Sequence, residues 1–330
     1  MARGRRRSSP GRKLLFALLP LVLVFGGLEA YLWGSGWPQM PEGAVFIHKD
    51  VYWVKEANLN LESTAHKERG GSFRVSTDQN GLRAPLHSET KPAGAFRVMT
   101  LGCSTTFGWG VDDAESYPAR LEAILNEGGH KVEVINGGQP GYTSFQGLWL
   151  WEKALAKYAP DVVIFGYLVQ DSRIVQYTDR SQALLTHNAD FLKQNLLHRL
   201  KTYLWIKEQI DARRTVAKES SEGGTPRIPI EEYVENIRAF AALSEAVGAK
   251  FMLFGYPLEV SGYTESHRAM LHAASKELPA PIFDPQPEMT RRTASETLFF
   301  PEDRGHANAA GNDVIAQGMA QFLVSNGLVK

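Results

Sequence analysis

The sequence predicts an α/β protein, with a parallel sheet covered by helices on both faces and an N-terminal transmembrane helix before it. Two observations predict this. From residue 96 onward, short apolar runs alternate with longer segments of helical periodicity, a pattern typical of parallel sheets with crossover helices. Near the N-terminus, a long uncharged apolar run follows a basic cluster, as in membrane-spanning segments.

The composition is that of a globular protein. The chain has 330 residues, of which 43% are hydrophobic and 22% charged, enough for one large or two ordinary domains. Its formal net charge is zero, so the overall balance gives no sign of nucleic-acid binding. Cys103 is the single cysteine, which excludes an intrachain disulfide. The histidines show no ligand spacing, which argues against a metal site. We also expect no organic cofactor.

The N-terminus predicts a single-pass anchor. Residues 1–13 form a basic tail without acids, and Leu14–Trp33 is an apolar run of 20 residues interrupted only by Glu29. As a helix this run is about 30 Å long, enough to cross a bilayer. The basic side should stay cytoplasmic, which places the body of the protein outside, in the periplasm or on the outer surface of a bacterium. A cleavable signal peptide and a buried core helix are the alternatives.

The remaining boundaries follow from changes in composition. Residues 34–95 read as a Gly- and Pro-rich tether and a small β-rich segment that contains the turn signal Gln79-Asn80-Gly81. Residues 96–330 form the α/β domain. Its expected strands are Phe96–Leu101, Val132–Ile135, Val162–Tyr167, Lys250–Tyr256 and Pro281–Phe283, and its clearest helices are Tyr117–Leu125, Phe145–Ala156 and Glu231–Val247.

A helical insertion at about residues 185–225 breaks this alternation. Phe191 to about Ser221 has apolar residues on one stripe, then becomes strongly charged and ends in a Ser- and Gly-rich loop. It reads either as a surface helix that packs on its own domain, or as a lid or membrane-resting helix near the site.

The candidate nucleophile is Ser104, in the stretch Gly102-Cys103-Ser104-Thr105-Thr106 that directly follows the first expected strand of the α/β domain. A serine at such a strand end is well placed for nucleophilic attack, but it needs a base to take its proton. His306 can serve as that base, and Asp303 can hold the imidazole tautomer. An oxyanion also needs donors, and a glycine backbone can approach a substrate closely.

Four blocks therefore carry the chemistry. They are Gly102–Thr106, the glycine-rich stretch Asn136–Ser144, Gln170-Asp171-Ser172, and Asp303-x-x-His306 with Asn308 and Gly311 after it. In this order they resemble the SGNH (GDSL-type) hydrolase superfamily over about residues 97–323. The single N-terminal helix and Asp78-Gln79-Asn80-Gly81-Leu82-Arg83 resemble its membrane-anchored bacterial branch.

The resemblance implies a flavodoxin-like three-layer α/β/α sandwich and esterase, lipase or related acyl-transfer chemistry. It implies that Ser104 is the nucleophile, His306 the base and Asp303 its acidic partner. The oxyanion hole would be the backbone N–H groups of Ser104 and Gly141, and a side-chain amide. Gln170 stands where the family has asparagine, and Cys103 stands where the family usually has aspartate or a small residue.

Each departure has an alternative reading. Cys103 could itself be the nucleophile, although a small buried hydrophobe is the plainer reading. Gln170 is one methylene longer than asparagine, so its amide could overshoot the oxyanion by about 1 Å, and loss of one such donor typically costs about 10²–10³ in rate. Trp109, Trp149 and Trp151 could form a sugar or acyl-chain platform, but core packing is the plainer reading.

The sequence thus predicts a membrane-anchored serine esterase that cleaves an O-acyl ester through an acyl-serine intermediate. Its partners would be an acyl-ester substrate, such as an acylated glycan or lipid, and the membrane, but not nucleic acid. One alternative is an O-acyltransferase that acts on an extracellular glycan or lipid with the same residues. The other is a non-catalytic binding protein on a degenerate hydrolase scaffold, for which Gln170 is the argument.

Overall fold

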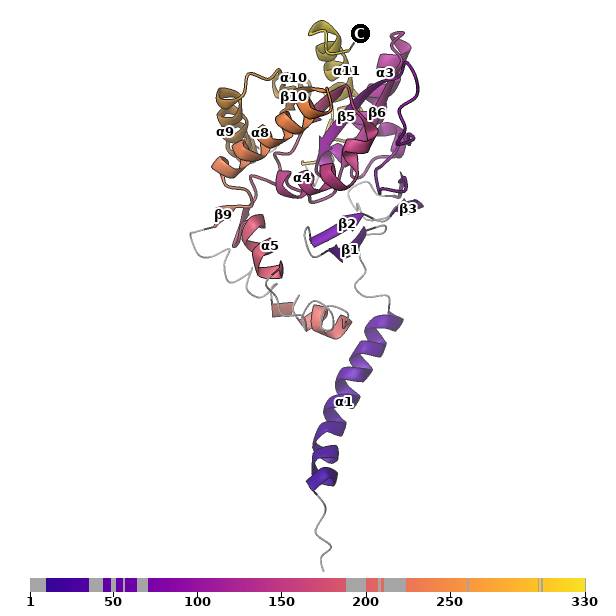
Figure 1. Cartoon of the computed structure of the whole chain (residues 1–330), viewed down its shortest axis with the longest axis vertical. Coiled ribbons are helices and arrows are strands. Elements are labelled where there is room, and N and C mark those ends of the chain that lie inside the picture. The colour runs from indigo at the N-terminus through magenta and orange to yellow at the C-terminus, as the bar shows by residue number, and fades with distance from the viewer. Residues whose placement is uncertain are drawn as a thin grey trace, which may run out of the picture. The chain divides into compact units, whose positions relative to one another are not determined.

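The computed structural model describes residues 10–35, 44–48, 52–55, 57–63, 71–187, 200–206, 209–210, 224–259, 261–301, 303 and 305–329 (Figure 1). The chain divides into two compact units. The larger comprises Pro41–His187 and Gly224–Lys330, and the smaller comprises Met1–Met40 and Asn188–Gly223.

The larger unit is built on a parallel sheet of five strands in the order β11-β10-β7-β5-β6. All five strands expected from the sequence are present: β5 (Phe96–Gly102), β6 (Val132–Gly138), β7 (Val162–Phe165), β10 (Lys250–Phe254) and β11 (Ile282–Phe283). Numbered within the sheet, this order is 2-1-3-4-5, the flavodoxin-like order. The chain goes from β5 to β6 on one side and then to β7 on the other. The order therefore reverses at β5, and a crevice at the carboxyl end of such a strand is where open α/β sheets place their sites.

Alternate side chains of the strands pack on opposite faces, as the two-residue period of a strand requires. Val98 belongs to a buried cluster with α3 (Tyr117–Glu127) and α11 (Ala309–Ser325). Its neighbour Met99 belongs to a second cluster with α4 (Ser144–Lys153), α8 (Ile230–Ala246) and α9 (Ser261–Glu277). Both clusters bury large apolar side chains, each of which contributes about 1.5–3 kcal/mol when removed from water. The three layers predicted for the domain follow from these two faces.

Shorter elements complete the larger unit. The helices are α2 (Ser104–Phe107), α5 (Asp179–His187), α10 (Gln286–Arg292) and the two 3-10 turns Asp113–Glu115 and Leu155–Tyr158. Within the described residues, three antiparallel pairs lie outside the main sheet: β1 (Ala44–His48) with β2 (Tyr52–Lys55), β3 (Asn60–Ser63) with β4 (Phe73–Ser76), and β8 (Ile174–Val175) with β9 (Thr225–Pro226).

Arg83 ties the segment before the sheet to the loop that follows α2. Its side chain is fully buried, and all five of its N–H groups donate. Asp113 accepts one at 2.9 Å, and the other acceptors are the backbone carbonyls of Arg74, Phe107, Gly108 and Val111. Burial lowers the pKa of the guanidinium, while Asp113 opposes this shift. The Asp78–Arg83 motif thus has a structural role beside the candidate nucleophile.

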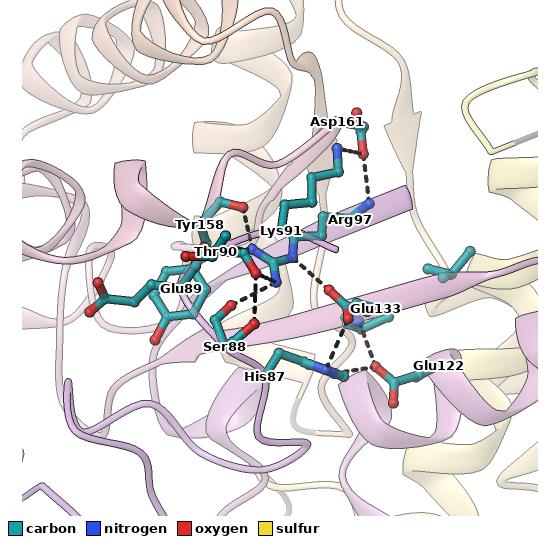
Figure 2. Close-up of polar contacts among 12 residues, drawn as sticks. His87, Ser88, Glu89, Thr90, Lys91, Arg97, Glu122, Glu133, Tyr158 and Asp161 are labelled. Atoms are coloured by element: carbon teal, nitrogen blue, oxygen red, sulfur yellow. Dashed lines mark hydrogen bonds and ion pairs between the residues drawn. The ribbon is translucent and has the colours of Figure 1, made fainter. Parts of the chain in front are cut away.

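A second buried arginine, Arg97, fixes the chain at the opposite end of β5 (Figure 2). Its Nε donates to Glu133 at 2.7 Å. Its other N–H groups donate to the carbonyls of Ser88 (2.6 Å), Glu89 (2.9 Å) and Tyr158 (2.7 Å). Since Arg97 lies near the start of β5 and Ser104 just beyond its end, this cluster supports the fold rather than the site.

The smaller unit contains α1 (Pro10–Gly34), which covers the predicted span 14–33. Among the residues that the structure describes, no helix is both long and apolar enough to cross a membrane, so the predicted transmembrane span is not confirmed. The basic tail lies in residues 1–13, of which 1–9 are outside the described residues.

Glu29, the one acid in the apolar run, binds a helical turn of the predicted insertion. Its carboxylate accepts the backbone N–H groups of Lys201 (2.9 Å) and Thr202 (2.8 Å), and the Lys201 ammonium lies 4.3 Å from the centre of the Trp33 ring. Within the smaller unit, the described part of the predicted helix 191–221 therefore contacts α1. The rest of that helix, residues 191–199, 207–208 and 211–221, lies outside the described residues.

Candidate active site

Ser104 lies just past the carboxyl end of β5, as the first residue of the short helix α2. Two glycines make this placement possible. A Cβ on Gly102 would lie 2.0 Å from the Thr106 hydroxyl, and a Cβ on Gly138 would lie 2.3 Å from the Phe107 nitrogen. Because α2 packs directly on both strand ends, any side chain there would displace the serine. Gly138 belongs to β6, so the glycine-rich turn expected from Asn136 begins three residues later, after the strand ends.

Ser104, His306 and Asp303 form one continuous line of hydrogen bonds. The Ser104 Oγ lies 2.8 Å from the His306 Nε2, and the His306 Nδ1 lies 2.5 Å from the Asp303 Oδ2. The structure thus brings the three predicted catalytic residues together across 202 positions of sequence. This is the arrangement in which an imidazole can take a proton from a hydroxyl while a carboxylate holds its other nitrogen.

The chain around His306 is held on both sides. The N–H of Ala307 donates to the Tyr256 hydroxyl at 3.0 Å, and the Asn308 side chain caps α11 by accepting the N–H of Gly311 at 3.0 Å. A Cβ on Gly311 would lie only 2.0 Å from the Leu298 carbonyl oxygen, so α11 begins in close contact with the preceding chain. The residues that follow the predicted histidine therefore fix its position.

Cys103 differs from its neighbour in environment. Its side chain is fully buried, its Sγ lies 3.3 Å from the Thr105 hydroxyl, and burial raises the pKa of the thiol. A buried thiol with a raised pKa is a poor nucleophile. The geometry favours Ser104 as the nucleophile and Cys103 as a small buried hydrophobe.

Gly141 and Gln170 follow β6 and β7, the two strands that flank β5. The N–H of Gln139 donates to the Gly102 carbonyl at 3.0 Å, and the N–H of Gly166 donates to the Leu101 carbonyl at 2.8 Å, so the chain beyond each strand is fixed to the end of β5. Gly141 has a φ of +77°, a conformation that favours glycine. Both residues thus follow strands that flank Ser104, and their role as oxyanion donors stays a prediction.

A buried polar network lies beside these loops. Asp171 is fully buried and accepts hydrogen bonds from the backbone N–H (3.1 Å) and the hydroxyl of Ser144, whose hydroxyl also accepts from Asn236 at 2.9 Å. Burial raises the pKa of Asp171 to about 7, against the opposing effects of the Ser144 hydrogen bonds and the Arg227 charge.

This shift predicts a pH-dependent stability. Because the folded protein holds the Asp171 proton more tightly than the unfolded chain, folding takes up a proton between about pH 4 and pH 7, and this residue's contribution to the free energy of unfolding falls as pH rises through that window. An Asp171→Asn variant lacks this titration. The free energy of unfolding of the variant minus that of the wild type should rise by about 1–4 kcal/mol between pH 5 and pH 8. Urea denaturation at each pH measures this difference. Parallel pH profiles for the two proteins would contradict the assignment.

The tryptophans considered as a ligand platform are packing residues. Trp151 is buried and meets the Phe240 ring edge-on, with ring centres 6.3 Å apart. Trp109 meets the Phe73 ring edge-on at 5.7 Å, and Trp149 packs against the second core cluster. The packing interpretation is therefore favoured for all three.

Two functional candidates were missed from the sequence. Arg227 and Asp179 form a buried ion pair beside Gly141 and Gln170, although they are 48 positions apart and no local pattern marks either. In the described residues there is no group of three or more His, Cys, Asp or Glu side chains that could hold a metal ion.

Comparison with known proteins gives a family and a set of similar folds. Residues 100–314 match the profile of the GDSL-like Lipase/Acylhydrolase family. No curated protein sequence matches the chain significantly. Three solved structures illustrate the likeness in fold. A lipase/acylhydrolase from Enterococcus faecalis is 16% identical with a TM-score of 0.46, over 71% of this chain and 97% of that one. A psychrotrophic esterase from Pseudoalteromonas sp. is 15% identical with a TM-score of 0.45, over 69% and 97%. A catalytic mutant of an acetylxylan esterase from Geobacillus stearothermophilus is 13% identical with a TM-score of 0.47, over 72% and 96%.

Proposed function

The chain belongs to the GDSL-like lipase/acylhydrolase family, and from that premise we propose that it is a serine esterase that cleaves an O-acyl ester through an acyl-Ser104 intermediate. The observation that carries this proposal is the line of hydrogen bonds from Ser104 through His306 to Asp303, with distances of 2.8 and 2.5 Å. A degenerate binding scaffold would not need this geometry.

The residues support a two-step reaction. The Ser104 Oγ attacks the ester carbonyl carbon while its proton passes to the His306 Nε2, and Asp303 holds the Nδ1–H of the resulting imidazolium. The oxyanion of the tetrahedral intermediate accepts hydrogen bonds from the N–H groups of Ser104 and Gly141 and from the Gln170 amide. The intermediate then releases the alcohol, which takes the proton from His306. Water then attacks the acyl-enzyme and gives its proton to His306. The acid is released, and the serine oxygen takes the proton back.

Hydrolysis and transfer share the first half of this reaction. If the acceptor is a hydroxyl of a glycan or lipid, that hydroxyl replaces water in the second half. An assay with p-nitrophenyl acetate, with and without an added oligosaccharide acceptor, separates the two. Esterase activity predicts acetate as the product in both cases, whereas acetylated oligosaccharide formed at the expense of acetate would indicate an acyltransferase.

The proposal is tested by labelling with a fluorophosphonate probe, which reacts with activated serines. The full chain in detergent should be labelled stoichiometrically, and mass spectrometry should place the label on Ser104. The label should be lost in a His306→Ala variant, which lacks the base, and kept in a Cys103→Ala variant, which changes only the neighbouring buried thiol. A folded protein that takes no label would overturn the proposal.

We also propose that the larger unit works outside the cytoplasm, with the N-terminal segment of residues 1–33 as its membrane anchor. In α1 the apolar side chains of Leu18, Leu19 and Leu21–Phe25 are exposed, and the basic cluster of residues 3–13 precedes them. A contiguous apolar surface of this kind calls for a covering partner. The full chain should stay in the membrane pellet after alkaline carbonate extraction, and recovery in the supernatant would overturn this part of the proposal.

A further inference from the structure

Arg227 contacts the two loops that carry the predicted oxyanion donors Gly141 and Gln170. Its side chain is nearly buried, with 9% of the residue exposed, and it follows β9 at the point where the chain returns to the larger unit. Its N–H groups bind residues of α4, of α5 and of the loops after β6 and β7. Nε and Nη2 donate to the two carboxylate oxygens of Asp179, each at 2.9 Å, and Nη2 also donates to the Gln146 Oε1 at 3.2 Å.

The two hydrogens of Nη1 go to the predicted oxyanion loops. One binds the carbonyl oxygen of Gly141 at 2.9 Å, and the other binds the Gln170 Oε1 at 3.0 Å. All five N–H donors of Arg227 are therefore used, and one nitrogen connects the loop after β6 with the loop after β7. These are the loops on either side of β5, which leads to Ser104.

The contact with Gln170 determines which end of its amide can face a substrate. A guanidinium can only donate, so the end of the amide that meets Arg227 must be the carbonyl oxygen. The NH2 group is then the end that is turned away from Arg227. An oxyanion is stabilised by donors and not by a carbonyl oxygen, so this is the orientation that the reaction needs. A Gln170 side chain rotated by half a turn would present its oxygen to the oxyanion instead.

The contact with Gly141 acts on the second donor. A hydrogen bond to the Gly141 carbonyl fixes the peptide plane on one side of this residue, and its φ of +77° sets the plane on the other side, which carries the N–H. Asp179 in turn holds the guanidinium with both oxygens and accepts the Thr143 hydroxyl at 2.6 Å. The ion pair is thus attached to the start of α4, two residues after Gly141.

We propose that Arg227 is a positioning residue of the oxyanion hole, which orients the Gln170 amide and the Gly141 peptide for donation. This inference rests on the proposed esterase function. It also accounts for glutamine at a position where an asparagine is expected. The carbonyl end of the longer side chain is fixed to a buried guanidinium, and this anchoring sets the reach of the NH2 group.

The test is a double-mutant cycle on kcat, measured with p-nitrophenyl acetate and the full chain in detergent. Arg227→Lys keeps the charge but has three donors in place of a planar fork, and it should lower kcat about 10- to 100-fold with KM changed less than about threefold. Gln170→Ala should lower kcat about 100-fold. In the double variant, the fold-loss of kcat should be at least about tenfold smaller than the product of the two single fold-losses, because both changes remove the same donor. Independent, multiplicative losses would overturn the proposal.

Gln170→Glu provides a second test that does not depend on the stability of an Arg227 variant. The carboxylate keeps the acceptor that binds Arg227 but has no N–H to donate, so kcat should fall at least as far as in Gln170→Ala while the melting temperature stays near that of the wild type. Wild-type kcat in this variant would overturn the proposal.

Arg180→Lys is the matched control. Arg180 lies next to Asp179 and pairs with Glu232 at 3.1 Å, but its side chain is 56% exposed, and its replacement should leave kcat unchanged. Measurements on the wild-type protein separate a failure of the proposed esterase function from a failure of the role proposed for Arg227. Absence of turnover and of fluorophosphonate labelling in the wild type would refute the esterase function. Labelling and turnover with an unaffected Arg227→Lys variant would refute only the role of Arg227.

Discussion

Replacement of Ser104 by alanine is expected to lower kcat for p-nitrophenyl acetate about 10⁶-fold while leaving the melting temperature within a few degrees of the wild type. The hydroxyl is the reacting group, so no other residue of the line to His306 and Asp303 can replace it. The fold should tolerate the change, because the lost bond to His306 can be replaced by water: the His306 side chain is 21% exposed. The measurement is a steady-state assay together with thermal unfolding followed by circular dichroism.

Cys103→Ala is the matched control for this variant. It changes the adjacent residue of the same turn and removes the alternative nucleophile. Because the thiol is fully buried, the change should cost stability, about 1 kcal/mol, rather than activity. The opposite result, in which Cys103→Ala is inactive and Ser104→Ala active, would assign the nucleophile to the thiol.

The strands of the sheet could be located from the sequence because each is a short apolar run, although the exact ends of β6, β7 and β10 differ from those expected. The helices α3, α4 and α8 could be predicted because their apolar positions repeat with a helical period. The helix α9 (Ser261–Glu277) was not predicted. It begins with Ser261-Gly262-Tyr263-Thr264-Glu265, which has no apolar stripe, and its buried side chains Met270, Leu271 and Ala274 belong to the same cluster as α8. Tertiary packing of this kind overrides a weak local pattern.

The end of β6 was misread because glycine has two uses. Asn136-Gly137-Gly138 was taken as the start of a turn, since glycine favours turns. In the structure these residues continue the strand and pair with Thr100, Leu101 and Gly102 of β5. Gly138 is needed there for close approach to α2, and Gly137 for close approach to the Thr100 carbonyl of β5, not for a special backbone angle. Such a requirement arises from a segment 30 residues earlier and cannot be read locally.

The difference between local sequence signals and contacts with distant segments also separates the parts of the site that were predicted from those that were not. Ser104, Asp303 and His306 lie in short motifs, so the neighbouring residues indicate their chemistry. The structure brings them within hydrogen-bond distance of one another. Arg227 and Asp179 lie on either side of the insertion, and their contact exists only because β8 and β9 pair and bring the two flanks together. Their connection to Gly141 and Gln170 is therefore a property of the fold.

Asp303→Asn is expected to lower kcat about 10⁴-fold without unfolding the protein. An Asn side chain that donates its NH2 to the His306 Nδ1 would leave the proton of the imidazole on Nε2, and that nitrogen could no longer accept the Ser104 proton. KM should change much less than kcat, since Asp303 acts on the histidine rather than on bound substrate. Steady-state kinetics and the rate of fluorophosphonate labelling both measure this effect.

Asp313→Asn is the control for this change, because it neutralises another carboxylate in a close pair, with Arg120 at 2.7 Å, on the helix that follows His306. Its kcat should equal that of the wild type. If Asp303→Asn kept more than a tenth of the wild-type kcat, then the 2.5 Å contact with His306 would have only a structural role, and the imidazole would need another group to set its tautomer. A loss in Asp303→Asn alone shows that this carboxylate keeps Nε2 of His306 free to take the serine proton.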